Sequence, residues 1–149
     1  MSAKLPVSVL VVIHTAALEV LMLERVSRPG YWQSVTGSLE RLDEPLEDAA
    51  RRELREETGI EAAGARLLRW RVANAFEIYA QWRHRFAPGT THNTEHVFSL
   101  RLPGRVSVAL APQEHRAHLW LPWREAAQKC FSWSNRDAIA MLPARGAPA

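Results

Sequence analysis

Three glutamates lie close together in the stretch Leu46–Thr58, which is rich in Ala, Leu, Arg and Glu, all strong helix formers. At about 100° per residue, Glu53 and Glu57 fall inside the apolar stripe of this helix, and Glu56 lies at its edge. Carboxylates on a packing face repel one another and resist desolvation, and a divalent cation between them removes both problems. Oxygen ligands favour Mg²⁺, with Mn²⁺ as an alternative. A solvated, charge-rich helix that packs loosely on its alanines is the other interpretation.

The limits of this helix can also be predicted. Asp43 is a favourable N-cap residue, and Pro45 stands where a missing N–H group does little harm. Gly59 supplies a C-terminal stop. We therefore expect a helix that is capped by Asp43 and ends at Thr58.

The stretch from Gly37 to Ile60 resembles the signature of the Nudix hydrolases. That signature is Gly, five residues, Glu, seven residues, then Arg-Glu-apolar-x-Glu-Glu-x-Gly-apolar. Its second half, which begins at Arg52, matches at every position. Six residues separate Gly37 from Glu44, so the loop is one residue longer than the pattern. We expect the extra residue to bulge outward and to leave the spacing of Glu44 and Arg52 intact.

The resemblance implies roles for the charged residues of the signature. Metal would be bound by Glu53 and Glu57. Glu44 would pair with Arg52 and orient the helix, and a surface salt bridge that contributes little is the alternative for this pair. Gly37 would support the site from the preceding loop. The catalytic residues implied are the three glutamates of the signature's second half: Glu53, Glu56 and Glu57.

Hydrophobic periodicity predicts many strands and few helices elsewhere in the chain. Strands are expected at 7–13, 20–25, 31–36, 65–72, 75–86, 95–102 and 118–121, and helices at 124–129 and 135–142. The last helix would be capped by Ser134 or Asn135. Strands that do not alternate regularly with helices favour a mixed sheet covered by helices. The resemblance implies an α+β fold, an α/β/α sandwich, formed by residues 1–149 as one domain with a frayed tail at 143–149.

Further segments resemble one subfamily of these hydrolases, the dihydroneopterin triphosphate diphosphatases of bacterial folate synthesis. They are KLPVS at 4–8, YWQSVTG at 31–37, FEIY at 76–79 with RHRFAPG at 83–89 and NTE at 93–95, and SWSNR at 132–136. Together they cover nearly the whole chain. They imply one more metal ligand, Glu114. The substrate-binding residues implied are Lys4, Arg25, Thr36, Phe76, Glu77, Ile78, Tyr79 and Ser132.

Each of these residues also has a purely structural interpretation. Lys4 would be a mobile terminal charge, Arg25 a solvated strand end, and Thr36 an ordinary β-former. The apolar residues of 76–79 would be core, although a planar pterin suits an aromatic-lined pocket. Glu114 would be a solvated loop carboxylate. His115 either tunes Glu114 or, as we favour, lies exposed on the loop.

Composition bounds the remaining classes of function. The 149 residues are 47% hydrophobic and 23% charged, typical of a globular domain with a real core. The net charge of +3 helps to attract a triphosphate, but no nucleic-acid-binding motif is present, so no nucleic-acid partner is expected. No apolar run is long enough to span a membrane. The single Cys130 cannot form an internal disulfide, which suits a reducing cytoplasm. The oligomeric state is not predicted.

The combined prediction is a Mg²⁺-dependent pyrophosphohydrolase acting on 7,8-dihydroneopterin 3′-triphosphate. Cleavage between the α and β phosphates would give the monophosphate and pyrophosphate. The first alternative is a nucleoside triphosphate pyrophosphatase acting on dATP or an oxidised purine nucleotide, because a purine and a pterin present similar planar faces. The second is a non-catalytic Nudix module that binds a ligand or a protein, and the presence of all three helix glutamates argues against it.

Overall fold

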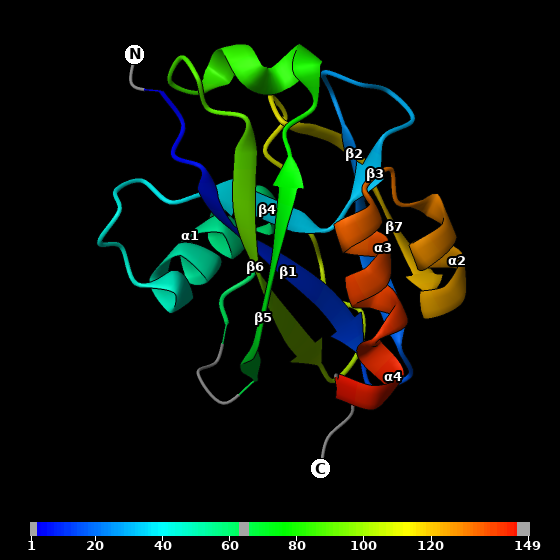
Figure 1. Cartoon of the computed structure of the whole chain (residues 1–149). Helices are drawn as coiled ribbons and strands as arrows, with labels where there is room; N and C mark the ends of the chain where they lie inside the picture. Colours follow the sequence, from blue (N-terminus) through cyan, green and yellow to red (C-terminus); the bar gives the residue numbers. More distant parts are fainter. Residues whose placement is uncertain (1–2, 63–65, 146–149) are drawn as a thin grey trace.

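The computed structural model describes residues 3–62 and 66–145, and the elements of that part form three layers (Figure 1). The central layer is a seven-stranded sheet in the order β3-β2-β1-β6-β5, with β4 paired to β1 and β7 paired to β2. β1 and β6 run parallel, whereas the other pairs are antiparallel. The strands are β1 (Val7–Thr15), β2 (Glu19–Arg25), β3 (Trp32–Gln33), β4 (Val35–Ser38), β5 (Leu67–Glu77), β6 (His92–Leu102) and β7 (His115–Pro122).

Helices cover both faces of this sheet. In Figure 1, α1 (Leu46–Thr58) lies to the left of the sheet, and α2 (Trp123–Lys129), α3 (Trp133–Ala140) and α4 (Leu142–Arg145) lie to the right. A 3₁₀ helix, η1 (Ala80–Arg85), follows β5. The mixed sheet and the α/β/α sandwich expected from the sequence are confirmed.

Each face of the sheet carries its own apolar core, and β1 contributes to both. Val9 and Val11 pack toward α1, whereas Leu10 and Val12 pack toward α2 and α3. This division follows from the alternation of side chains along a strand. The near-continuous apolar run of β1 is therefore the sequence signature of a strand buried on both faces.

The segments on either side of β5 differ from the prediction. The strand expected at 75–86 ends at Glu77, and η1 follows, closed by a hydrogen bond from Trp82 N to Tyr79 O (2.9 Å). The two strands expected at 65–72 and 75–86 are joined in a single strand, β5. Its pairing with β6 is irregular between Arg69 and Ala73, and Arg71 has a positive φ of 57°. Residue 65, the predicted start, lies outside the described residues.

The predicted strand at 31–36 is divided into β3 and β4 at Ser34. The backbone N–H of Ser34 donates to Asn135 Oδ1 (2.8 Å), and the Ser34 hydroxyl accepts from Asn135 Nδ2 (3.0 Å). Asn135 therefore ties the sheet to α3 instead of capping that helix. The N-cap is Ser132, whose Oγ accepts from the backbone N–H of Asn135 (3.2 Å), so the predicted cap at Ser134 or Asn135 is wrong.

The N-terminus of α1 also corrects a prediction. The residue at the N-cap is Pro45, and no side chain caps the helix. Asp43 is exposed and pairs with Arg41 (2.9 Å). The position next to the helix is taken by Glu44, whose carboxylate accepts from the backbone N–H of Glu40 (2.9 Å) and so closes the loop. At the other end, Gly59 stops the helix in the left-handed conformation, as expected.

A buried ion pair fixes the orientation of α1. Arg52 Nε and Nη2 donate to the two carboxylate oxygens of Glu44, each at 3.1 Å, and Nη2 also donates to Ser38 O (3.1 Å). The side chains of Glu44 and Arg52 are only 7% and 16% exposed. This is not the exposed salt bridge that was the structural alternative. The loop residues 40–43 are all exposed, so the additional loop length is accommodated toward solvent.

The C-terminal residues are better ordered than the frayed tail that we predicted. Leu142–Arg145 form α4, and Arg145 Nη1 donates to Trp70 O (3.0 Å). The prediction is wrong for 143–145, and 146–149 lie outside the described residues. None of the helices in the described ranges combines the length and hydropathy needed to cross a membrane.

The Glu44–Arg52 pair predicts a pH-dependent stability. Hydrogen bonds from Arg52 hold the pKa of Glu44 below its ordinary value, so the pair stabilises the fold above the unfolded-state pKa and loses this contribution as the pH falls. Glu44→Gln should lower the free energy of unfolding by about 1–3 kcal/mol at pH 7, and the difference should shrink below roughly pH 4. Urea unfolding at both pH values measures this, with the exposed Glu125→Gln as control. Equal stability of Glu44→Gln and wild type at pH 7 would contradict it.

Candidate active site

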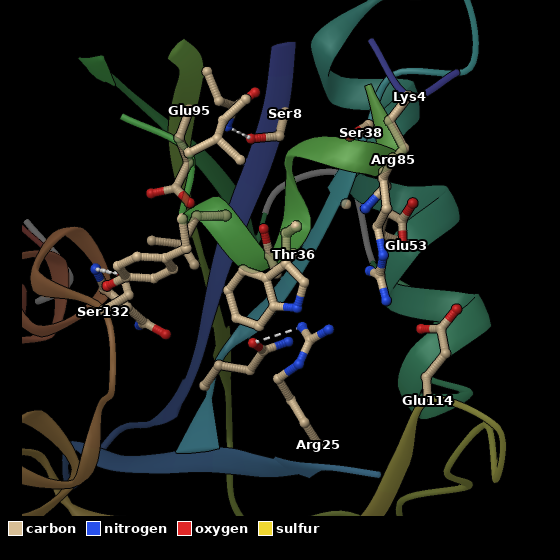
Figure 2. Close-up of a pocket in the computed structure, with 18 of the residues that line it drawn as sticks. Lys4, Ser8, Arg25, Thr36, Ser38, Glu53, Arg85, Glu95, Glu114 and Ser132 are labelled. Atoms are coloured by element: carbon tan, nitrogen blue, oxygen red, sulfur yellow. Dashed lines mark hydrogen bonds between the residues drawn. The ribbon is translucent and has the colours of Figure 1, made fainter. Parts of the chain in front are cut away.

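A pocket of about 1150 Å³ opens at one end of the sheet, beside η1 and the N-terminus of α3. Its lining comes from β1, β4, β5 and β6, from α1 and from the loop before β7. Figure 2 shows Glu53 and Glu114 at one side, Glu95 and Ser132 at the other, and Arg25 between them. The pocket therefore has two chemically different ends.

Two carboxylates of α1 are buried at the end of the pocket where Glu53 and Glu114 lie, as the helical periodicity predicted. Glu53 is 8% exposed and Glu57 only 1%. Burial raises the pKa of both carboxyls, and the mutual interaction of the two side chains raises that of Glu57 further. Glu53 also accepts a hydrogen bond from Arg52 Nη1 (2.7 Å), whereas Glu56 is exposed, 3.5 Å from the same nitrogen, and lines the pocket.

Two further groups lie at this end of the pocket: Glu114, in the loop before β7, and His115, the first residue of β7. One potential ligand atom each from Glu57, Glu114 and His115 lies within 4.8 Å of the others. Among residues 3–62 and 66–145, no group hydrogen-bonds to Glu57 Oε1 or His115 Nδ1, and both atoms are buried. A divalent cation would occupy the free oxygen positions and offset the repulsion between the carboxylates. The residues present therefore fit a metal site. Glu114, which periodicity could not assign, is close to Glu57.

His115 is not the exposed loop histidine that we favoured. It is 3% exposed, and its Nδ1 lies 3.8 Å from Glu57 Oε1. Burial, followed by repulsion from Arg25, lowers its pKa to about 4, so the ring is neutral at pH 7. Its Nε2 lies 3.2 Å from the amide nitrogen of Gln33.

The hydrogen-bond chain assigns the protonated nitrogen of His115. Arg25 Nη1 can only donate, and it lies 3.3 Å from Gln33 Oε1, so the amide nitrogen of Gln33 faces His115. His115 Nε2 must then accept, which places the proton on Nδ1, facing Glu57. In this arrangement the Nδ1–H group of His115 faces Glu57 Oε1 at 3.8 Å, which is beyond hydrogen-bond distance, and the unprotonated Nε2 is turned toward Gln33.

Positive charge lies at the carboxylate end of the pocket, where Figure 2 shows Lys4 and Arg85 beside Glu53, and extends to Arg25. Arg25 is held by Gln33 and stacks over the Trp82 ring (4.8 Å to the centroid), so it is not a solvated strand end. The backbone N–H of Lys4 donates to Arg85 O (2.8 Å), which ties this exposed residue to the end of η1, and its side chain lines the pocket. Desolvation, with repulsion from Arg85 and Arg25, lowers the pKa of Lys4. Three cations thus converge where an anionic ligand would compensate them.

The remaining predicted substrate residues all line the pocket, but in different ways. Thr36 Oγ1 donates to Val9 O (3.0 Å), so its hydroxyl is engaged by the sheet. Phe76 is half-buried and meets Trp133 edge to face, with 6.4 Å between centroids. Ser132 is the N-cap of α3. The carboxylate of Glu77 is exposed and paired with Arg83.

Ile78 and Tyr79 complete the predicted segment. Ile78 is 5% exposed, whereas Tyr79 is 42% exposed and belongs to an aromatic group with Trp82 and Phe131. The centroids of Trp82 and Phe131 are 5.8 Å apart, and both residues line the pocket.

Sequence reasoning missed several lining residues. Asn93 and Glu95 occupy alternate, inward positions at the start of the apolar strand β6, where polar side chains are unusual. That pattern was available in the sequence. Arg85, Trp82 and Phe131 are brought in by η1 and by the α2–α3 connection, whose conformation periodicity does not specify.

With this geometry, comparison with known proteins gives a consistent result. The NUDIX domain model matches residues 4–142, and the chain belongs to the Nudix family. The dihydroneopterin triphosphate diphosphatase of Escherichia coli K12 is 45% identical over 139 residues, 91% of each chain. That of Haemophilus influenzae is 36% identical over 89% of this chain and 84% of the relative. A solved structure of the E. coli dihydroneopterin triphosphate pyrophosphohydrolase superposes with a TM-score of 0.88 at 42% identity, covering 95% of this chain and 97% of that one.

The close approach of β4 and α1 predicts a sharp steric requirement at Gly37. A Cβ atom added there would lie 2.1 Å from Glu53 Cδ, so an alanine must push this carboxylate out of place. We expect Gly37→Ala to lower kcat by about 10²-fold, the loss that a misplacement of roughly 1 Å can cause. The fold should survive because the side chain of Glu53 can rotate.

The matched control is Gly104→Ala, since a Cβ at Gly104 meets no atom within 4 Å. Turnover with saturating Mg²⁺ and thermal unfolding of both variants would be compared. Wild-type kcat in Gly37→Ala would show that the position of Glu53 does not matter.

Proposed function

We propose that this chain is a Mg²⁺-dependent Nudix hydrolase that converts 7,8-dihydroneopterin 3′-triphosphate into dihydroneopterin phosphate and pyrophosphate in folate biosynthesis. The observation that carries this proposal is the two-ended pocket. Buried carboxylates and cations at one end suit a metal-bound triphosphate, and aromatic and polar side chains at the other suit a planar ring. The names of the E. coli and H. influenzae relatives support the choice of substrate.

Glu53, Glu57 and Glu114 would hold the metal ion, with Mn²⁺ as an alternative to Mg²⁺. When bound, such an ion neutralises phosphate charge and makes a coordinated water more acidic. The Nδ1–H group of His115 would face Glu57 Oε1 across 3.8 Å, too far for a hydrogen bond, and would attract that carboxylate electrostatically. Glu56, exposed at the pocket wall, is proposed as a further catalytic carboxylate.

The cations have a separate task in this account. Arg25 is held in place by Gln33 and the Trp82 ring before any ligand arrives, so little side-chain entropy is lost when its guanidinium binds a phosphate. Lys4 and Arg85 add charge at the same part of the pocket (Figure 2). Together they would hold the triphosphate with its anhydride bond near the carboxylate cluster.

The small-molecule triphosphate is the only partner that we propose. The compartment that suits a chain with one free cysteine, Cys130, is the reducing cytoplasm. Purine nucleoside triphosphates are the competing substrates, because the metal and cation end can bind any triphosphate. Discrimination must therefore arise at the ring end.

The substrate profile tests this function. We expect kcat/KM to decrease from dihydroneopterin triphosphate to purine nucleotides to pyrimidine nucleotides, because polar groups that bind a pterin edge are left unpaired by a pyrimidine. Parallel kinetics with Mg²⁺, with products identified as monophosphate and pyrophosphate, would establish the order. A pyrimidine nucleotide as the best substrate would contradict the proposal.

A single variant separates ring binding from metal binding. Phe76→Ala should lower kcat/KM for the pterin triphosphate about 10-fold, the effect of losing one stacking or edge contact with a planar ring. The Mg²⁺ concentration needed for half-maximal activity should not change. Leu68→Ala, at an exposed position of the same strand, is the control and should behave as wild type. A changed Mg²⁺ requirement in Phe76→Ala would contradict the division of the pocket into two ends.

A further inference from the structure

The ring end of the pocket contains two buried acceptor atoms without a donor. Glu95 is 5% exposed and Asn93 is 7% exposed. Glu95 Oε1 and Asn93 Oδ1 have no hydrogen-bond partner within residues 3–62 and 66–145. Both side chains line the pocket. Because a buried acceptor without a partner is destabilising, two of them in one pocket point to donors supplied by a ligand.

The surroundings of Glu95 provide polar contacts but no cation. Ser134 interacts with its carboxyl, and Ser8 stands opposite it in the parallel pairing of β1 and β6. Ser8 Oγ accepts from Asn93 Nδ2 (2.8 Å), which leaves Asn93 Oδ1 free. No lysine, arginine or histidine in the described part of the chain forms a salt bridge with Glu95. Burial raises its pKa to about 7, so the charge of this carboxylate is poorly compensated by the protein.

Glu95 also lies at the end of the pocket that is proposed to bind the ring of the substrate, away from the part that is proposed to bind the phosphates. Figure 2 places it on the side of Ser132, opposite Glu53 and Glu114. Phe76, the predicted ring contact, stands opposite Asn93 in the pairing of β5 and β6. A carboxylate near this aromatic side chain would repel phosphate, whereas it would bind a pair of N–H donors strongly.

We propose that the Glu95 carboxylate, with Asn93 beside it, recognises the amino-pyrimidinone edge of the pterin by accepting hydrogen bonds from its 2-amino group and ring N3–H. These two donors point in nearly the same direction and match the two oxygens of a carboxylate. Guanine presents the same pair through its 2-amino group and N1–H. Adenine presents one donor beside one acceptor, so an ionised carboxylate cannot satisfy it. This inference rests on the proposed function and makes Glu95 a specificity-determining residue.

Glu95→Gln tests the proposal because it keeps the size of the side chain and replaces one acceptor with a donor. We expect kcat/KM for dihydroneopterin triphosphate and for dGTP to fall about 100-fold, since the new N–H group faces a donor. The value for dATP should stay the same or rise, because an amide matches the donor and acceptor of adenine. Glu125→Gln, exposed on α2, is the control. A uniform loss on all three substrates, or no loss on the pterin, would overturn the proposal.

A comparison within the wild-type protein avoids dependence on the folding of the variant. dITP differs from dGTP only in lacking the 2-amino group. The wild type should prefer dGTP by at least about 10-fold, and Glu95→Gln, if folded, should lose that preference. Equal kcat/KM for dGTP and dITP in the wild type would overturn the role of Glu95.

The two proposals fail in different ways. If the wild type hydrolyses dihydroneopterin triphosphate no better than dATP, the proposed function fails, whatever the guanine preference. If the pterin is the preferred substrate but Glu95→Gln leaves the ratio of pterin to dATP unchanged, the function stands and the inference about Glu95 is wrong.

Discussion

The burial of Glu53 and Glu57 on the packing face of α1 is the constraint on which the rest of this structure depends. A helix normally keeps its carboxylates toward solvent, because desolvation and mutual repulsion oppose placing two of them in a core. Here Arg52 contacts Glu53 while it is itself held by Glu44, so the helix cannot rotate to release these side chains. Gly37 leaves room for Glu53 where any side chain would collide. The stability of the fold therefore keeps these carboxylates together despite their repulsion, and a bound cation would reduce that repulsion.

The pocket around that cluster has one end suited to a metal-bound triphosphate and another end suited to the ring of the substrate. In the proposed function the carboxylates and cations would act on the phosphates that are common to many substrates, whereas the ring end would meet the part of the molecule that differs between them. Strand β1 pairs with β4, which lies against Glu53, and with β6, which carries Asn93 and Glu95, so one sheet joins the two ends. Gln33 adds a further connection, since it accepts a hydrogen bond from Arg25 and contacts His115, which lies beside Glu57. The separation of the two ends is thus set mainly by the sheet, whereas Glu114 is supplied by the loop before β7.

Much of this could be predicted from the sequence, and the failures have physical causes. The helix of the signature and the strand β1 carry strong periodic patterns, and both form as expected. Asp43 does not cap α1, because Glu44, which is hydrogen-bonded to Arg52, occupies the position beside the helix. The strand expected at 75–86 ends at Glu77, because local hydrogen bonds form η1 beside the pocket instead. Glu114 lies in a loop and His115 begins β7, and only tertiary structure brings these two residues to α1.

The most direct test of the central claim is thermal unfolding of the wild type and of Glu57→Gln, each with and without Mn²⁺. Without metal, Glu57→Gln should be at least as stable as the wild type, because it removes a buried carboxyl that repels Glu53. At a Mn²⁺ concentration roughly 100 times the Kd, the wild-type Tm should rise by about 5–10 °C, whereas that of Glu57→Gln should rise much less. An equal rise in both proteins, or a Glu57→Gln protein that is strongly destabilised without metal, would contradict the account.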